Sequence, residues 1–185
     1  MRKRKIKTIN SANSGVTLIE LLIAMAIFSI VMTAVYGVYS AYSKTAAIQT
    51  ASAWAQQNAR GGIELMLREI RMAGLDATGS AGAGIETASP GKIRITADRN
   101  GNGNIDETDF ERVSYTLSGK DLRRILYEGT GSQNTATIIE NVTDLAFTYS
   151  GSEVTIFLGV EEPAGRAEPV VRSLETTVHC RNLDY

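Results

Sequence analysis

The chain has 185 residues, of which 43% are hydrophobic and 21% are charged. This composition excludes a disordered tail, a collagen and a coiled-coil rod, and the length suits one domain with an appendage. The 19 Lys and Arg and the 20 Asp and Glu give a net charge of −1, which excludes a general nucleic-acid binder. A single cysteine, Cys180, and a single histidine, His179, exclude an intrachain disulfide framework and any site that needs two of either residue.

The N-terminal region changes abruptly from basic to apolar. Residues 1–15 contain five cations and no acid, whereas residues 16–43 contain one charged side chain, Glu20. A helix over residues 16–43 would extend roughly 42 Å, which exceeds the ~30 Å hydrocarbon core of a bilayer. Because the cations precede the apolar run, they are expected to stay in the cytoplasm while the run crosses the membrane.

Three other interpretations of this region explain less. A buried core helix would be shorter than this run. A cleaved secretory signal has an apolar stretch of about 7–15 residues followed by a small-residue cleavage site, and the apolar run at residues 16–43 is longer than that. A plain single-pass anchor explains the hydropathy but not Glu20, because a carboxylate inside the bilayer costs about 2.5–3.5 kcal/mol. The presence of Glu20 in the apolar run therefore needs a functional explanation.

The segment 15–22, GVTLIELL, resembles the cleavage and methylation motif of type IV prepilins and type II secretion pseudopilins. A basic leader ends in Gly15, an apolar run follows, and Glu20 is the fifth residue after the cleavage point. The resemblance implies that prepilin peptidase cleaves between Gly15 and Val16 and methylates the new amine of Val16. It also implies a single-pass subunit of the inner membrane, with a periplasmic C-terminal domain, which is later drawn into a filament.

The chemistry of Glu20 fits this implication. Cleavage creates an α-amine at Val16, and in a stack of helices Glu20 of one subunit can meet the amine of its neighbour. The pair neutralises a carboxylate that would otherwise be alone in an apolar core. Any axial slip would bury the acid unpaired, so the pair also fixes the register between subunits.

The sequence divides into a leader at 1–15, a transmembrane and filament-core helix at 16–45, and an exported domain at 46–185. The helix is expected to continue into the exported domain, because apolar residues recur there at steps of three or four. This stripe consists of Ile48, Ala51, Ala55, Ala59, Ile63, Met66 and Ile70, widened by Trp54 and Leu67. Gly74 is expected to end the helix. Since the chain has no proline before Pro90, the helix is not expected to have the proline kink of many major pilins.

The remainder of the chain predicts an antiparallel sheet. Residues 74–91 are small, polar and Gly-rich, which predicts a long loop. From Lys92 onward the apolar residues alternate with polar ones, which predicts strands. The expected strands are 92–97, 112–117, 123–128, 144–150, 153–160 and 170–181, with two-residue hairpin turns at 119–120 and 151–152. One long helix followed by such strands is an α+β fold, and the resemblance implies a pilin-like one.

Residues 98–109, DRNGNGNIDETD, follow the spacing of an EF-hand calcium loop. Oxygen-bearing side chains occupy the first, third, fifth, ninth and twelfth positions, which are Asp98, Asn100, Asn102, Asp106 and Asp109. Gly103 stands at the sixth position, where the loop turns sharply, and Asn104 at the seventh would offer its backbone carbonyl. Glu111 could assist the shorter Asp109. Hard oxygen donors without His or Cys favour structural Ca²⁺, whereas the alternative is a polar turn that binds nothing.

The resemblance extends to a subgroup and to a role. The loop, the absence of a C-terminal disulfide pair and the terminal segment 181–183 resemble PilW-like minor pilins and J-type pseudopilins. This implies a non-enzymatic subunit that initiates or caps a filament at its tip, together with other minor and major subunits. A membrane-anchored, calcium-dependent adhesin or ligand-binding module is the alternative, and the sequence shows no catalytic motif that would favour an enzyme.

Overall fold

The computed structural model describes residues 15–183, so most of the expected leader lies outside the described residues. The chain forms two compact units, one ending at Ser43 and the other beginning at Lys44. A single helix, α1 (Leu18–Ile70, 53 residues), supplies the apolar segment of the first unit and the core-facing helix of the second. The helix is continuous through Gly37, as the absence of proline predicts.

The first part of α1 is apolar all round and has no buried residue. All residues from 15 to 45 are exposed. α1 is the one helix in the described part of the chain that is long and apolar enough to cross a membrane. Its polar side chains Ser29 and Thr33 donate to the carbonyl oxygens of Met25 and Ser29, each at 2.8 Å. These hydroxyls therefore need no water and are compatible with lipid.

The second part of α1 buries the expected stripe. The buried members are Ala51, Ala55, Ala59, Ile63, Met66 and Ile70. Two residues assigned to the stripe are not buried. Ile48 lies on the same face as Ala51 and Ala55 but is 37% exposed, because it precedes the first buried residue of α1. Trp54 is 55% exposed, because it lies at the flank of the stripe. α1 also buries Gly62 and Glu69, which the apolar spacing does not predict.

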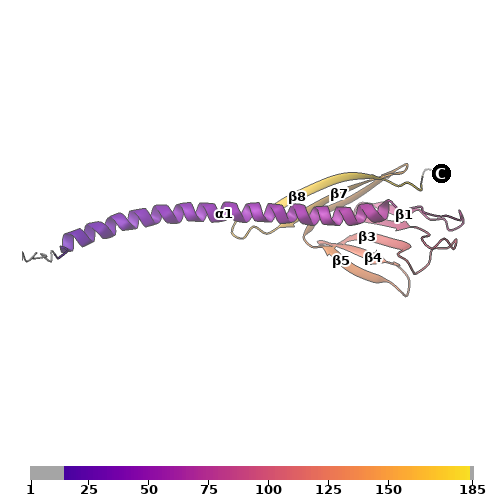
Figure 1. Cartoon of the computed structure of the whole chain (residues 1–185), viewed down its shortest axis with the longest axis horizontal. Helices are drawn as coiled ribbons and strands as arrows, with labels where there is room; N and C mark the ends of the chain where they lie inside the picture. Colours follow the sequence, from indigo (N-terminus) through magenta and orange to yellow (C-terminus); the bar gives the residue numbers. More distant parts are fainter. Residues whose placement is uncertain (1–14, 184–185) are drawn as a thin grey trace, which may run out of the picture. The chain divides into compact units, whose positions relative to one another are not determined.

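Five antiparallel strands form the first sheet, in the order β1-β2-β3-β4-β5. They are β1 (Ile85–Ser89), β2 (Lys92–Thr96), β3 (Arg112–Ser118), β4 (Asp121–Leu126) and β5 (Asn134–Ile139). Three antiparallel strands form the second sheet, in the order β6-β7-β8. They are β6 (Val142–Ser150), β7 (Glu153–Glu162) and β8 (Val170–His179). In Figure 1 the two sheets diverge on either side of the second part of α1.

The strands predicted from alternation are confirmed, and so are both two-residue hairpins, which pair Ser118 with Asp121 and Ser150 with Glu153. Three expectations are wrong. The loop predicted at 74–91 contains β1, β5 was not predicted, and the strands form two sheets rather than one. β1 and β5 are short and polar, and they become strands because β2 and β4 offer them partners.

The core lies between α1 and the inner faces of both sheets. Its largest fully buried apolar side chains are Met66, Ile70, Ile93, Tyr115, Leu122, Ile156 and Leu158. At Gly62 the helix approaches both sheets closely, because an added Cβ would lie 2.2 Å from Cδ1 of Ile139 and 3.7 Å from Cδ2 of Leu158. A long helix packed on antiparallel sheets is the expected pilin-like α+β fold.

Candidate functional site

The candidate assembly site lies at the start of α1. Gly15, Val16 and Thr17 precede the helix and are exposed, and among the described residues no atom beyond the immediate chain neighbours lies within 4 Å of a Cβ built at Gly15. The Gly15–Val16 bond is therefore in an open, non-helical stretch, which is the kind of backbone that peptidases reach. The position agrees with the expected cleavage point, although cleavage itself stays a prediction.

Thr17 and Glu20 form a capping box at the first turn of α1. The Glu20 backbone N–H donates to Thr17 Oγ1 at 3.3 Å, and the Thr17 backbone N–H donates to Glu20 Oε2 at 2.9 Å. The Thr17 hydroxyl also donates to Glu20 Oε2, at 2.8 Å. The Thr-x-x-Glu spacing of residues 17–20 is the sequence signal of such a capping box. It gives the acid a local partner before any neighbouring subunit is present.

The surroundings of Glu20 are apolar. Val16 and Leu18 are 78% and 77% exposed, and no other acid lies between Val16 and the end of the apolar run. Both bonds from Thr17 end on Oε2, so within the described residues Oε1 has no hydrogen-bond partner. The carboxylate can thus cap its own helix with one oxygen and accept a proton donor from outside with the other.

The comparisons with known proteins address this same segment. Residues 10–36 match the prokaryotic N-terminal methylation motif, and the match includes Gly15, Val16 and Glu20. The match covers the N-terminal segment that carries the expected cleavage point and no part of the exported domain. No curated protein and no solved structure matches it, so the motif assigns no subgroup to this pilin-like chain.

The second candidate site of this pilin-like chain is the loop at 98–111. Asp98 is 1% exposed, and its carboxylate accepts backbone N–H groups from Gly101 at 2.8 Å, Asn102 at 3.2 Å and Gly103 at 2.9 Å. Three N–H groups that point to one carboxylate fold the loop into a tight turn. Gly103 has φ of +83°, which is the left-handed conformation expected of the sixth position.

The middle of the loop brings three predicted ligands together. The side-chain amides of Asn100 and Asn102 both point to Oδ2 of Asp106. Asn104 instead donates its backbone N–H to Oδ1 of Asn102 at 2.9 Å. Asp109 is exposed and has φ of +52°. The third, fifth and ninth positions therefore lie together, but the two asparagines turn their amide nitrogens toward Asp106, and not the oxygens that would bind Ca²⁺.

Glu111 organises the base of the loop. It is 1% exposed, and it accepts backbone N–H groups from Arg99 at 3.0 Å, Asn100 at 3.1 Å and Asp106 at 2.7 Å. Sequence spacing suggested only an auxiliary role for this residue. The local sequence carries no signal of this larger role, because an acid directly before a strand is usually exposed.

The donor set of the loop suits Ca²⁺ in kind, because all of its donors are hard oxygens. A carboxylate oxygen that accepts one N–H keeps a second lone pair, so the hydrogen bonds of Asp98 do not prevent coordination. However, residues 15–183 contain no group of three His, Cys, Asp or Glu side chains that could hold a metal ion. Calcium binding by Asp98, Asn100, Asn102, Asn104, Asp106 and Asp109 therefore stays a prediction.

A buried ionic cluster attaches α1 to the five-stranded sheet. Arg124 of β4 donates to both carboxylate oxygens of Glu69, and the Tyr115 hydroxyl donates to Oε2 of the same acid. Burial and the negative charge of Glu69 raise the pKa of Tyr115. Burial lowers the pKa of Arg124, but the bonds to Glu69 outweigh it, so the net shift is upward. The guanidinium also lies 5.3 Å from the ring centroid of Phe110, at the end of the 98–111 loop.

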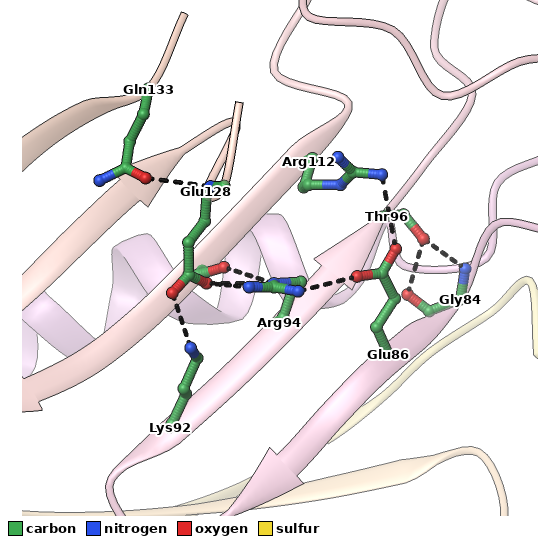
Figure 2. A network of polar contacts seen from close by, with 10 residues as sticks. Gly84, Glu86, Lys92, Arg94, Thr96, Arg112, Glu128 and Gln133 are labelled. Carbon is green, nitrogen blue, oxygen red and sulfur yellow. Dashed lines mark hydrogen bonds and ion pairs between the residues drawn. The ribbon is translucent and has the colours of Figure 1, made fainter. Parts of the chain in front are cut away.

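A second ionic network covers the outer face of the same sheet. Figure 2 shows Arg94 between two acids, Glu128 and Glu86. Lys92 also reaches Glu128, with Nζ 2.6 Å from Oε1. Burial of the Glu128 carboxyl raises its pKa, but hydrogen bonds from Lys92 and Arg94 prevail and lower it to about 2. The network ties β1, β2 and the end of β4 together.

The two residues at the end of β8 point to opposite sides, as alternation predicts. His179 is exposed, and its Nε2 lies 3.2 Å from Ser152 Oγ. Cys180 is fully buried, and its Sγ donates to the Ile70 carbonyl oxygen at 3.3 Å. The thiol thus contacts the last turn of α1, and its burial argues against a disulfide to a neighbouring subunit.

Proposed function

We propose that the chain is a non-enzymatic minor pilin or pseudopilin subunit that helps to initiate or cap a type IV pilus or a type II secretion pseudopilus. One observation carries this proposal. The open Gly15–Val16 bond stands directly before an apolar helix whose first turn holds Glu20. Prepilin peptidase cleavage at that bond would place an α-amine within one helical turn of the only acid in the apolar run.

The geometry of Glu20 supports pairing between subunits. Oε2 already accepts the Thr17 N–H and hydroxyl, which leaves Oε1 for the amine of a neighbouring Val16. Because the surrounding side chains are apolar, such a pair would be far more favourable than a solitary carboxylate. The pair would also set the axial register of a helical stack of parallel subunits.

Two features support a minor rather than a major subunit. α1 is uninterrupted from Leu18 to Ile70, whereas many major pilins have a proline kink in this helix. The chain also has one cysteine, which is buried, so it cannot form the C-terminal disulfide pair that is common in major pilins. The same proposal includes an inner-membrane location for the precursor, a place at the tip of the filament and contacts with other minor and major subunits.

Substitution of Glu20 tests the proposal. Glu20→Ala should leave the leader cleaved and the subunit in the membrane, but should remove the subunit from sheared filaments or stop their assembly. Glu64→Ala is the matched control, because Glu64 is an exposed acid of α1 outside the apolar segment. Wild-type incorporation of the Glu20→Ala subunit would refute the assembly role. Intact filaments with lost adhesion would instead favour the calcium-dependent adhesin or ligand-binding module.

A further inference from the structure

The outer end of the apolar segment carries three exposed tyrosines at intervals of three residues. Tyr36, Tyr39 and Tyr42 are 67%, 66% and 72% exposed. Lys44 follows them and is the first charged residue after Glu20. Tyrosine and lysine concentrate where a helix leaves the bilayer, because the aliphatic and aromatic parts contact lipid while the polar ends reach water.

The spacing along α1 fits this location. From Val16 to Tyr36 the helix rises about 30 Å, which equals the thickness of the hydrocarbon core. From Tyr36 to Tyr42 it rises about another 9 Å, which is comparable to one headgroup layer. If the new N-terminus lies at the cytoplasmic boundary, the three phenol rings therefore lie at the opposite one.

The surface around the tyrosines is apolar. A shallow groove there is lined by Ala34, Val35, Val38, Tyr39 and Tyr42. A helix in water at this position would need a polar face, and this stretch has none before Lys44. An apolar helix surface with phenol hydroxyls at one end is suited to the boundary between the lipid tails and the headgroups.

We infer that Tyr36, Tyr39 and Tyr42 form an aromatic belt that holds the unassembled subunit in the periplasmic headgroup layer of the membrane. The hydrocarbon-spanning part of the chain is then residues 16–35, which is shorter than the segment 16–45 expected from hydropathy. This inference rests on the membrane-anchored state in the proposed function, but it does not depend on filament assembly.

Tryptophan depth measurements test the belt. The single tryptophan is replaced by Trp54→Phe, and one new tryptophan is introduced by Tyr39→Trp in the belt or by Phe28→Trp in the middle of the span. The full chain is reconstituted in phosphatidylcholine and phosphatidylglycerol vesicles that contain lipid brominated near the headgroup or deep in the acyl chain. The belt predicts stronger quenching of Tyr39→Trp by shallow bromine and stronger quenching of Phe28→Trp by deep bromine.

Two results would overturn the belt. Tyr39→Trp quenched mainly by deep bromine would place residue 39 inside the hydrocarbon, as in a longer span or a tyrosine face that packs on another helix. Tyr39→Trp quenched by neither lipid would place it in water. If Phe28→Trp also escaped quenching, the membrane anchor of the proposed function would fail as well. If the Glu20→Ala test refuted the assembly role, the membrane depths of Tyr39→Trp and Phe28→Trp would not change. The aromatic belt and the assembly role are therefore tested separately.

Discussion

Arg124 on β4 holds Glu69 on α1 in a two-pronged ion pair, with Nε 3.1 Å from Oε2 and Nη2 bonded to Oε1. The acid is almost fully buried, and it also accepts the Tyr115 hydroxyl. Two side chains from two strands thus meet at one carboxylate of the helix. Because a fork of two parallel bonds is directional, this cluster fixes the rotation of α1 against the five-stranded sheet.

Removal of the acid from this cluster should destabilise the exported domain strongly. Glu69→Ala leaves the Arg124 guanidinium and the Tyr115 hydroxyl without their shared acceptor, and we expect a loss of about 3 kcal/mol in the free energy of unfolding. Urea unfolding of the full chain in detergent measures this loss. The double variant Glu69→Leu/Arg124→Met should recover part of it, and equal losses in the single and double variants would contradict the pairing.

The adjacent glycines of α1 should respond in opposite ways to alanine. Gly62→Ala places a Cβ 2.2 Å from Cδ1 of Ile139, so we expect a loss of about 1–3 kcal/mol as the side chains shift. Gly61→Ala meets no atom within 4 Å and should gain about 0.5–1 kcal/mol, because alanine favours the helix. Thermal unfolding of both variants gives the two signs. Equal effects would show that α1 does not approach Ile139 as described.

Glu128 should contribute stability that depends on pH. Its pKa is lowered from 4.5 to about 2, so its contribution is complete above pH 4.5 and is lost as the pH falls toward 2. Glu128→Gln should reduce the free energy of unfolding by about 1 kcal/mol at neutral pH, since the ion pairs are only partly buried. The difference between wild type and variant, followed by urea unfolding, should shrink below pH 4.5. A difference that stays constant to pH 2 would be inconsistent with the Lys92 and Arg94 pairs.

The loop at 98–111 should bind Ca²⁺ weakly, in the range of about 10⁻⁴–10⁻³ M that is common for extracellular modules. Chelation should lower the melting temperature of the exported domain, and added Ca²⁺ should restore it. Asp106→Asn removes the charge on which Asn100 and Asn102 converge and should abolish the response, whereas Glu107→Gln, an exposed neighbour outside the ligand set, should keep it. Titration calorimetry without heat, together with no stabilisation at millimolar Ca²⁺, would remove the prediction.

Sequence periodicity predicts the parts of this fold in which burial follows a simple repeat. The stripe from Ala51 to Ile70 and the alternation in β2, β3 and β7 are such cases. Periodicity does not predict β1 and β5, because their own residues bury little surface and their pairing depends on strands elsewhere in the chain. The division into two sheets likewise depends on tertiary packing, which no local pattern encodes.

The candidate sites show the same limit. Gly15, Val16 and Glu20 can be identified in advance because a short motif carries their chemistry. The buried positions of Glu69 and Glu111 cannot be identified from the sequence, because an acid in an apolar stripe or before a strand is usually exposed. Their partners, Arg124 and the backbone of residues 99–106, become visible only when the chain is folded.

The mass and terminal sequence of the mature subunit test the central claim most directly. The protein is recovered from the membrane or filament fraction of cells that produce it together with prepilin peptidase, and its N-terminal peptide is analysed by mass spectrometry. The account predicts a chain that begins at Val16 and carries one methyl group on its α-amine. A chain that still begins at Met1 with its basic leader would contradict it, because Glu20 would then have no neighbouring amine to meet.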